Sequence, residues 1–300
     1  MDKILLTGAT GYIGSNLTKR LLKENKRVYI VARKSSKFDL LKDVMDKINI
    51  FIYDGKINNL INYFKRVKPD AVCHLASFFV SEHKSENTDE LIDSNIKFGT
   101  EVLEAMSKSG VKNLINTGTS WQHYDNKDYN PVCLYAATKE AFEKIIEYYV
   151  QVDNFKVITL KLFDTYGPND NRPKILNLLS KYSKDKTVLK MSGGEQILDL
   201  SYIDDIAEAF YHALCMIEKC DMNEHKTYGI YALKRYKLRD IISTYENVTN
   251  KKILVEWGAR PYRKREIMNP CTCIEKLPGW KPKISLEDGI RLMNSLNKVI

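Results

Sequence analysis

The chain has 300 residues, of which 44% are hydrophobic and 28% charged, and its formal net charge is +9. This composition is ordinary for a globular protein with a sizeable core, and every apolar run is far shorter than the roughly 18 residues that cross a bilayer, so we expect no membrane segment. The lysines are interleaved with acids, as in KEAFEKIIE, which indicates solvated helix faces and argues against a nucleic-acid partner.

The cysteines and the first residues of the chain indicate the cellular compartment of the protein. The six cysteines are scattered, and their only close spacings, C-x4-C and C-x-C, have no second zinc-type pair. We therefore expect free thiols and no metal site. Polar residues and glycine interrupt the first apolar stretch, KILLTGATGYIG, so no signal peptide is expected. Together these features predict a cytoplasmic protein.

Short β-branched runs alternate with helical patterns through the first half of the chain. The expected strands cover 4–6, 28–31, 48–52, 71–75, 113–117 and 157–162. The expected helices between them include 13–23, 87–109 and 135–150. Alternation of this kind predicts an α/β fold with a Rossmann-like, doubly wound parallel sheet.

Beyond residue 167 the pattern is less regular. Helical patterns cover 201–219, 237–250 and 285–296, the last with Ser285 as its expected N-cap. We expect a dinucleotide-binding domain over 1–167, completed by about 199–227. The segments 168–198 and 228–300 should form a smaller C-terminal substrate-binding lobe.

A glycine-rich loop lies between the first expected strand and the first expected helix. In ILLTGATGYIGSNL, Gly8 permits a tight turn, Gly11 lets the backbone approach a diphosphate, and Gly14 allows close packing of helix on strand. The N–H groups at the start of the helix then face the anion. The loop, with Thr10, Tyr12 and Ile13 between its glycines, predicts a dinucleotide site; a plain glycine turn is the alternative.

The end of the second strand indicates which dinucleotide is bound. An NAD site carries a carboxylate there for the ribose hydroxyls, but RVYIVARKSSK places Ala32 at that position, followed by Arg33, Lys34 and Ser35. A guanidinium can hold a 2′-phosphate in a bidentate manner. The charge pattern therefore favours NADPH over NADH, unless these residues are only a solvated basic turn.

A tyrosine and a lysine stand four residues apart in LYAATKEAFEKI. On a helix, Tyr135 and Lys139 share one face. By themselves they are either an ordinary surface pair or a proton donor beside a cation.

Several segments together resemble the extended short-chain dehydrogenases/reductases that act on nucleotide sugars. The resemblance covers nearly the whole chain and rests on TGATGYIG, HLAS, SNIKFGT, TGTS, YAATK, LFDTYGP, DLSYIDDIA and LPGWKPKISLEDGI. It implies that Thr119 takes the place of the catalytic Ser/Thr, with Ser120 as the alternative, and that Tyr135 and Lys139 complete the catalytic set. It further implies cofactor contacts from Asp54, Gly55, Leu75, Ala76 and Ser77. A nearby ammonium and a cationic nicotinamide should lower the pKa of the phenol, so that Tyr135 can exchange a proton with a sugar oxygen.

The two residues after Thr119 limit which reaction of the family is expected. Dehydratases of this family carry one or two acids there, whereas this chain has Ser120 and Trp121, so dehydration is not expected. The stretches TSWQHY, NPVCLYAATK and FDTYGPND most resemble reductases of nucleotide-linked 4-keto-6-deoxy sugars, of the CDP-abequose or dTDP-fucose synthase type. We expect such an NADPH-dependent 4-ketoreductase, working on precursors of bacterial surface polysaccharide. The alternative is an NAD-dependent nucleotide-sugar 4-epimerase.

The resemblance also implies a set of substrate contacts. Asp164 replaces an asparagine that many relatives carry, which leaves its hydrogen-bonding role open. Trp121 either walls the sugar pocket or belongs to the core, His123 either flanks the sugar or lies on the surface, and Cys133 is either an acid–base group or an inert thiol. Cations suited to the diphosphate are Arg172, Lys174, Arg260, Arg263 and Arg265, with Arg263 favoured. Family resemblance implies a homodimer that uses the helix of Tyr135.

Overall fold

The computed structural model describes residues 1–296 and confirms the predicted α/β fold. A seven-stranded sheet has the order β10-β6-β5-β4-β1-β2-β3, and all of its strand pairs are parallel. Its strands are β1 (Lys3–Thr7), β2 (Arg27–Arg33), β3 (Ile48–Tyr53), β4 (Ala71–His74), β5 (Asn113–Thr119), β6 (Lys156–Leu162) and β10 (Glu224–Ile230). The order reverses between β1 and β4, so a ligand crevice is expected at the carboxyl ends of those two strands.

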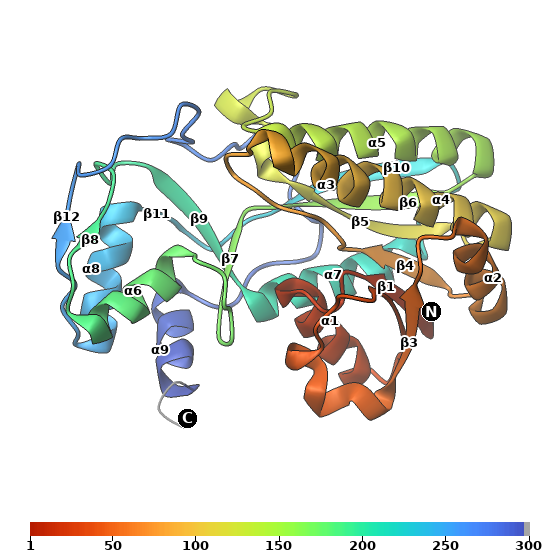
Figure 1. Cartoon of the computed structure of the whole chain (residues 1–300), viewed down its shortest axis with the longest axis horizontal. Coiled ribbons are helices and arrows are strands. Elements are labelled where there is room, and N and C mark those ends of the chain that lie inside the picture. Colours follow the sequence, from red (N-terminus) through yellow and green to blue (C-terminus); the bar gives the residue numbers. More distant parts are fainter. Residues whose placement is uncertain (297–300) are drawn as a thin grey trace.

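Helices cover both faces of this sheet (Figure 1). On one face lie α1 (Tyr12–Lys23) and α7 (Ile203–Ile217), and on the other lie α2 (Ile57–Val67), α4 (Phe98–Ser109) and α5 (Leu134–Asp153). Side chains of β1 point alternately to the two faces of the sheet. Ile4 and Leu6 belong to the core formed with α1 and α7, and Leu5 belongs to the core formed with α2, α4 and α5. Burial on both faces is why the strands are nearly continuous apolar runs.

The helix predicted over 87–109 is interrupted. It consists of α3 (Thr88–Ile92), a π-helical turn (Asp93–Lys97) and then α4. The π turn carries Asn95, which is buried. Its amide donates to the carbonyl oxygen of Phe78 (3.0 Å) and the Thr138 hydroxyl (3.0 Å), and its oxygen accepts from the Ser77 hydroxyl (3.0 Å). Asn95 thereby fixes the loop after β4 against α5.

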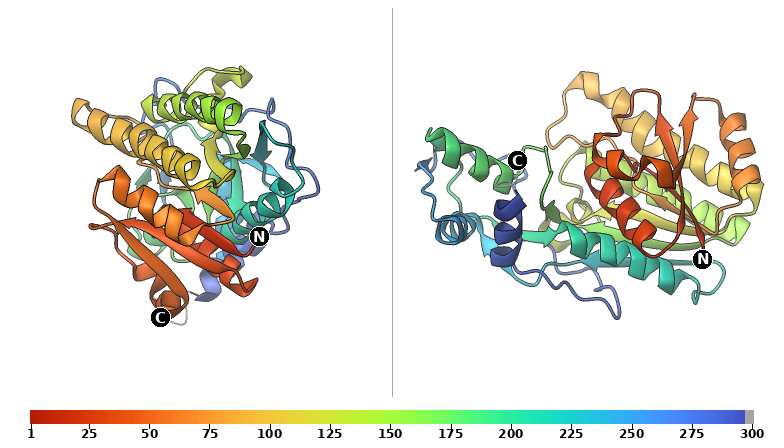
Figure 2. Two further views of the ribbon diagram at one scale, coloured as in Figure 1. Left: turned by 90° about the vertical axis from the view of Figure 1, so that its right-hand side faces the viewer. Right: turned by 90° about the horizontal axis from the view of Figure 1, so that it is seen from below.

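The remaining elements gather beyond the carboxyl ends of the sheet, at the left of Figure 1 and at the left of the right-hand view of Figure 2. A three-stranded sheet has the order β11-β9-β7, and a two-stranded sheet pairs β12 with β8. These elements are β7 (Asp164–Tyr166), α6 (Ile175–Asp185), β8 (Leu189–Lys190), β9 (Ile197–Tyr202), β11 (Arg235–Lys237), α8 (Leu238–Thr249), β12 (Val255–Glu256) and α9 (Leu286–Leu296).

The C-terminal elements have their own hydrophobic core, in which Tyr166, Leu179, Ile241 and Ile290 are buried. The predicted Ser285 cap is confirmed, because its hydroxyl accepts from the N–H of Asp288 at 3.1 Å. The proposed division into 1–167 with 199–227, and 168–198 with 228–300, stays a prediction, and its last four residues lie outside the described chain. Within residues 1–296, none of the helices has the length and apolarity needed to span a bilayer.

Candidate active site

The glycine loop joins β1 to α1 and forms the floor of a cleft. Gly8 has a φ of +70°, and a Cβ there would lie 2.5 Å from the backbone nitrogen of Ala76. A Cβ on Gly14 would lie 2.2 Å from the carbonyl oxygen of Gly8. The first turn of α1 carries no acidic side chain. Its N–H groups therefore face the cleft without a competing anion, which suits a diphosphate.

The cleft above this loop has a volume of about 830 Å³. That size lies within the range of small-molecule and cofactor sites. The predicted cofactor contacts that line it are Gly8, Thr10, Gly11, Arg33, Ser35, Gly55, Leu75, Ala76 and Ser77. Tyr12, Ile13, Gly14, Lys34 and Asp54 lie outside this lining. The Asp54 carboxylate instead accepts from the N–H of Lys56 (3.1 Å) and the amide of Asn59 (2.9 Å) at the start of α2.

Basic and acidic side chains line opposite parts of this cleft. The end of β2 and the residues after it provide Arg33 and Lys37, whereas the segment 86–101 provides Lys97 and five acids that the sequence analysis did not identify. These acids are Glu86, Asp89, Glu90, Asp93 and Glu101. No carboxylate stands at the end of β2, where the position of the acid is occupied by Ala32. The residues present therefore fit a dinucleotide, with cations beside its expected ribose.

Thr119 ends β5 and begins a 3₁₀ turn over Ser120–Gln122. Its hydroxyl accepts from the N–H of Trp121 (3.3 Å), and its own N–H donates to the Gln122 side-chain oxygen (2.9 Å). These two bonds cap the short turn. They also fix the Thr119 side chain at the carboxyl end of the sheet.

Tyr135 lies in the first turn of α5 and belongs neither to the lining of the cleft nor to that of a second pocket. Its ring meets Phe79 edge-on at 4.9 Å between centroids, and Phe79 in turn contacts Trp121 at 5.5 Å. Burial raises the pKa of the Tyr135 phenol to about 12, and the Ser77 side chain offsets only part of that rise. The sequence analysis predicted that an ammonium and a cationic nicotinamide lower this pKa. In the protein without coenzyme the pKa is raised instead, because the effect of burial is larger than that of the neighbouring groups. At neutral pH the phenol keeps its proton.

Lys139 lies one turn further along α5 and is only 1% exposed. Burial lowers the pKa of its ammonium to about 8; Glu143 opposes this change and Lys161 adds to it. The ammonium is therefore still mostly protonated at neutral pH, but it is easier to discharge than a surface lysine. Lys139 itself, although predicted as a cofactor contact, lies outside the cleft lining.

A buried ionic network lies behind these residues. Lys161, in β6, donates to both carboxylate oxygens of Glu143 at 2.9 and 2.7 Å. The Gln122 amide donates to Glu143 at 3.0 Å and to Glu140 at 2.6 Å. Because Gln122 also holds the Thr119 N–H, the network connects α5 and β6 to the turn that carries Thr119.

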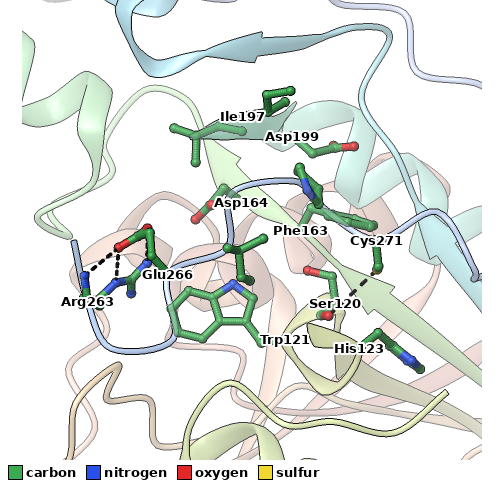
Figure 3. A pocket seen from close by; sticks show the side chains of 13 residues that line it. Ser120, Trp121, His123, Phe163, Asp164, Ile197, Asp199, Arg263, Glu266 and Cys271 are labelled. Atoms are coloured by element: carbon green, nitrogen blue, oxygen red, sulfur yellow. Dashed lines mark hydrogen bonds and ion pairs between the residues drawn. The ribbon is translucent and has the colours of Figure 1, made fainter. Parts of the chain in front are cut away.

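A second pocket has Trp121 in its lining (Figure 3). Its volume is about 40 Å³, so it must widen to admit a sugar. Its lining includes the predicted substrate contacts Ser120, Trp121, His123, Asp164 and Arg263. It also includes Phe163, Ile197, Leu198, Asp199, Glu266, Ile267, Pro270 and Cys271, which the sequence analysis did not single out.

The other predicted cations lie outside this lining. Arg172 pairs with Asp170 (2.8 Å) and stacks over the Tyr12 ring at 4.7 Å. Lys174 pairs with Asp164 (2.7 Å) and lies over Phe79 at 5.5 Å. Arg260 is exposed.

Two further side chains stand close to the predicted site. Arg265 stacks over the Tyr124 ring at 4.3 Å. Cys133 is half-buried, and burial raises the pKa of its thiol.

Several of the side chains that surround the site left weak signals in the sequence. Lys161 interrupts an otherwise apolar strand, VITLKL, which is itself a sign of a buried partner. Glu143 follows Lys139 by four residues on the same helix face. Asn95 lies within SNIKFGT, one of the segments that carry the family resemblance. Phe79 had no such signal, because its role depends on contacts between segments distant in the chain.

The fold and the site define a dinucleotide-binding α/β protein with a Tyr-x-x-x-Lys pair at the carboxyl edge of its sheet. The NAD dependent epimerase/dehydratase family matches residues 4–230, and the chain belongs to this family. This confirms the resemblance to the extended short-chain dehydrogenases/reductases.

Curated relatives and solved structures agree with this assignment. CDP-abequose synthase of Yersinia pseudotuberculosis is 28% identical, covering 89% of this chain and 91% of the relative. UDP-glucuronate 4-epimerase of Thermodesulfobacterium geofontis is also 28% identical, covering 97% and 94%. Among solved structures, UDP-glucose 4-epimerase of Thermotoga maritima with UDP-glucose has a TM-score of 0.83 at 22% identity, covering 100% and 99%. The Thermus thermophilus UDP-glucose 4-epimerase complex with NAD has a TM-score of 0.79 at 22% identity, covering 97% of both chains.

Proposed function

We propose that this chain is a nucleotide-sugar-modifying enzyme that uses NADPH to reduce the C4 keto group of a nucleotide-linked 4-keto-6-deoxy sugar. One observation carries the proposal. Tyr135 is next to Ser77, which lines the cleft, and its ring contacts Phe79, which in turn contacts Trp121 of the second pocket. A proton donor in that position can serve a carbonyl held in the pocket.

A reduced nicotinamide supplies the hydride when it is bound. The residues of this chain then handle the proton and the charge. The Tyr135 hydroxyl, which keeps its proton at neutral pH, donates it to the sugar oxygen. The Thr119 hydroxyl stabilises negative charge on the same oxygen, and Lys139 binds the nicotinamide ribose and supports the phenol.

A phenol that keeps its proton suits reduction as the direction of reaction. Reduction needs a proton donor at the start, whereas oxidation of a saturated sugar needs a base. The similarity to CDP-abequose synthase supports the same direction. The second candidate, a nucleotide-sugar 4-epimerase that keeps NAD, is supported by the relative of that name and by the epimerase structures with NAD.

The decisive experiment is a turnover assay with nucleotide-linked 4-keto-6-deoxy sugars. The proposal expects stoichiometric loss of NADPH absorbance with formation of the 6-deoxy sugar. Redox-neutral isomerisation of a saturated nucleotide sugar would establish the epimerase instead. A thermal-shift panel of UDP, GDP, CDP and dTDP, each with NADPH or NADH, identifies the nucleotide and the coenzyme.

Replacing Arg33 by serine should weaken NADPH binding by about 10- to 100-fold and change NADH binding little, since one charge-assisted contact with a 2′-phosphate is lost. Arg33 is exposed and lines the cleft beside Ala32. The matched control is Lys34→Ser, because Lys34 is the adjacent cation and lies outside the lining. Titration of both coenzymes by intrinsic fluorescence measures the effect. Equal losses of affinity for the two coenzymes would show that Arg33 does not bind the 2′-phosphate.

We also propose a cytoplasmic homodimer that uses α5. Two apolar side chains one helical turn apart, Tyr148 and Val152, are 60% and 57% exposed on this helix. An apolar pair at this spacing suits packing against a second copy of the helix.

A further inference from the structure

The charges of the second pocket are paired one to one. Its lining contains three carboxylates, those of Asp164, Asp199 and Glu266. Asp164 binds Lys174 at 2.7 Å, and Glu266 binds Arg263 at 2.8 Å. Asp199, which is 2% exposed, binds Arg235 at 2.9 Å. Each of the three acids of the pocket wall therefore holds a cation, and the one cation of these three that lines the pocket, Arg263, is already neutralised by Glu266.

Other charged or titratable groups lie near the pocket. Arg265 comes from the same segment as Arg263 but lies outside the lining; among the described residues its guanidinium pairs with no acid, and it donates to Asn130 at 2.5 Å. Lys161 is held by Glu143. Burial, aided by the charge of Lys161, lowers the pKa of His123, so its imidazole is neutral at neutral pH. Among the described residues 1–296, the pocket lining thus holds no cation without an acid partner.

The electrostatics of the pocket already disfavour another anion. Burial raises the pKa of the Asp199 carboxyl, and the negative charge of Asp164 raises it further. The rest of the wall is largely apolar, with Trp121, Phe163, Ile197 and Pro270 facing the cavity. A carboxylate placed there would lose its hydration without gaining a cationic partner.

Opening of the pocket need not free these cations. Arg263 and Glu266 are three residues apart on one segment, so their ion pair can move with that segment as a unit. Their guanidinium–carboxylate contact has two hydrogen bonds, at 2.9 and 2.8 Å. Bidentate pairs of this kind are among the strongest in proteins.

We propose that these ion pairs make the pocket selective for nucleotide sugars that are uncharged at C6, and that it rejects uronates. This inference rests on the proposed function, since it assumes that the second pocket holds the sugar. It separates this chain from relatives such as UDP-glucuronate 4-epimerase, whose name implies a substrate with a carboxylate at C6. It makes Asp164 and Glu266 specificity-determining residues.

The test compares two ligands that differ only at C6. The nucleoside diphosphate that gives the largest thermal shift is used with glucose or with glucuronate attached to its terminal phosphate, and the C6 carboxylate of the glucuronate is left free. These two sugar esters of the diphosphate, called the glucose ester and the glucuronate ester, are each titrated by calorimetry in the presence of the preferred coenzyme. The wild-type protein should bind the glucose ester at least about tenfold more tightly. Equal binding, or tighter binding of the glucuronate ester, would overturn the proposal. Because only binding is measured, the result stands apart from whether the ketoreduction itself occurs.

Two variants test the cause. Glu266→Gln frees the Arg263 guanidinium, and Asp164→Asn frees the Lys174 ammonium; each should shrink the preference for the neutral ester by about tenfold. The control is Asp46→Asn, an exposed acid in the 3₁₀ segment η1 (Asp39–Lys47), which should leave the preference unchanged. If both pocket variants keep the wild-type ratio while still binding the glucose ester, the ion pairs do not set the selectivity.

Discussion

Replacing Tyr135 by phenylalanine should lower the rate of keto-sugar reduction by about 10²–10⁴-fold, the usual contribution of a positioned acid or base. The substitution removes the only proton that the ring can donate. It keeps the edge-on contact with Phe79, which involves the ring alone. Binding of coenzyme and nucleotide should therefore stay close to wild type, and the loss should fall on kcat.

The matched control for this substitution is Tyr129→Phe, which removes the same hydroxyl from a side chain that is 52% exposed. Its rate should equal that of the wild type. Thermal shifts with each ligand check that the Tyr135 variant is folded and loaded. Undiminished turnover in that variant would assign the proton transfer to another group, and the proposed mechanism would have to be abandoned.

Replacing Lys161 by methionine should destabilise the protein by about 3–5 kcal/mol, because it leaves a buried carboxylate without its cation. Lys161 is 2% exposed and Glu143 is 7% exposed. Gln122 can donate only one amide group to the remaining charge. The turn that carries Thr119 should loosen as well, since Gln122 holds its N–H at 2.9 Å. Chemical denaturation gives the stability, and the reduction rate reports on the turn.

Lys144→Met is the matched control for this buried pair. Lys144 forms an ion pair with Glu140, which belongs to the same network, at 3.4 Å, but the Lys144 side chain is 74% exposed. A surface pair of this kind contributes at most about 1 kcal/mol. Replacing Lys161 and Glu143 together by apolar residues should recover part of the loss, since no uncompensated charge then remains. Similar losses for the Lys161 and Lys144 variants would show that burial does not govern the strength of this network.

The site predicted from the sequence depended on local patterns. The glycine loop, the Tyr-x-x-x-Lys pair and the basic end of β2 each lie within a short segment, so their geometry follows from one turn, one helix or one strand end. The structure places most of the predicted cofactor contacts in one cleft and five of the predicted substrate contacts in one pocket. Their individual roles remain proposals.

Six strands of the main sheet, their parallel arrangement and the glycine loop followed from the sequence itself, because hydrophobic periodicity and glycine spacing are local features; the seventh strand, β10, was not predicted. Tertiary structure alone decided three other features. Desolvation raises the pKa of Tyr135, although an ammonium four residues away predicted the opposite. Phe79 stands against that ring, and the preceding residue, Phe78, donates its N–H to Asn95 of the π turn. Arg263, which lines the pocket, and Lys174, which lies outside its lining, were predicted as diphosphate ligands but are paired with acids. Burial and charge pairing arise between segments far apart in the chain, which is why no local pattern contains them.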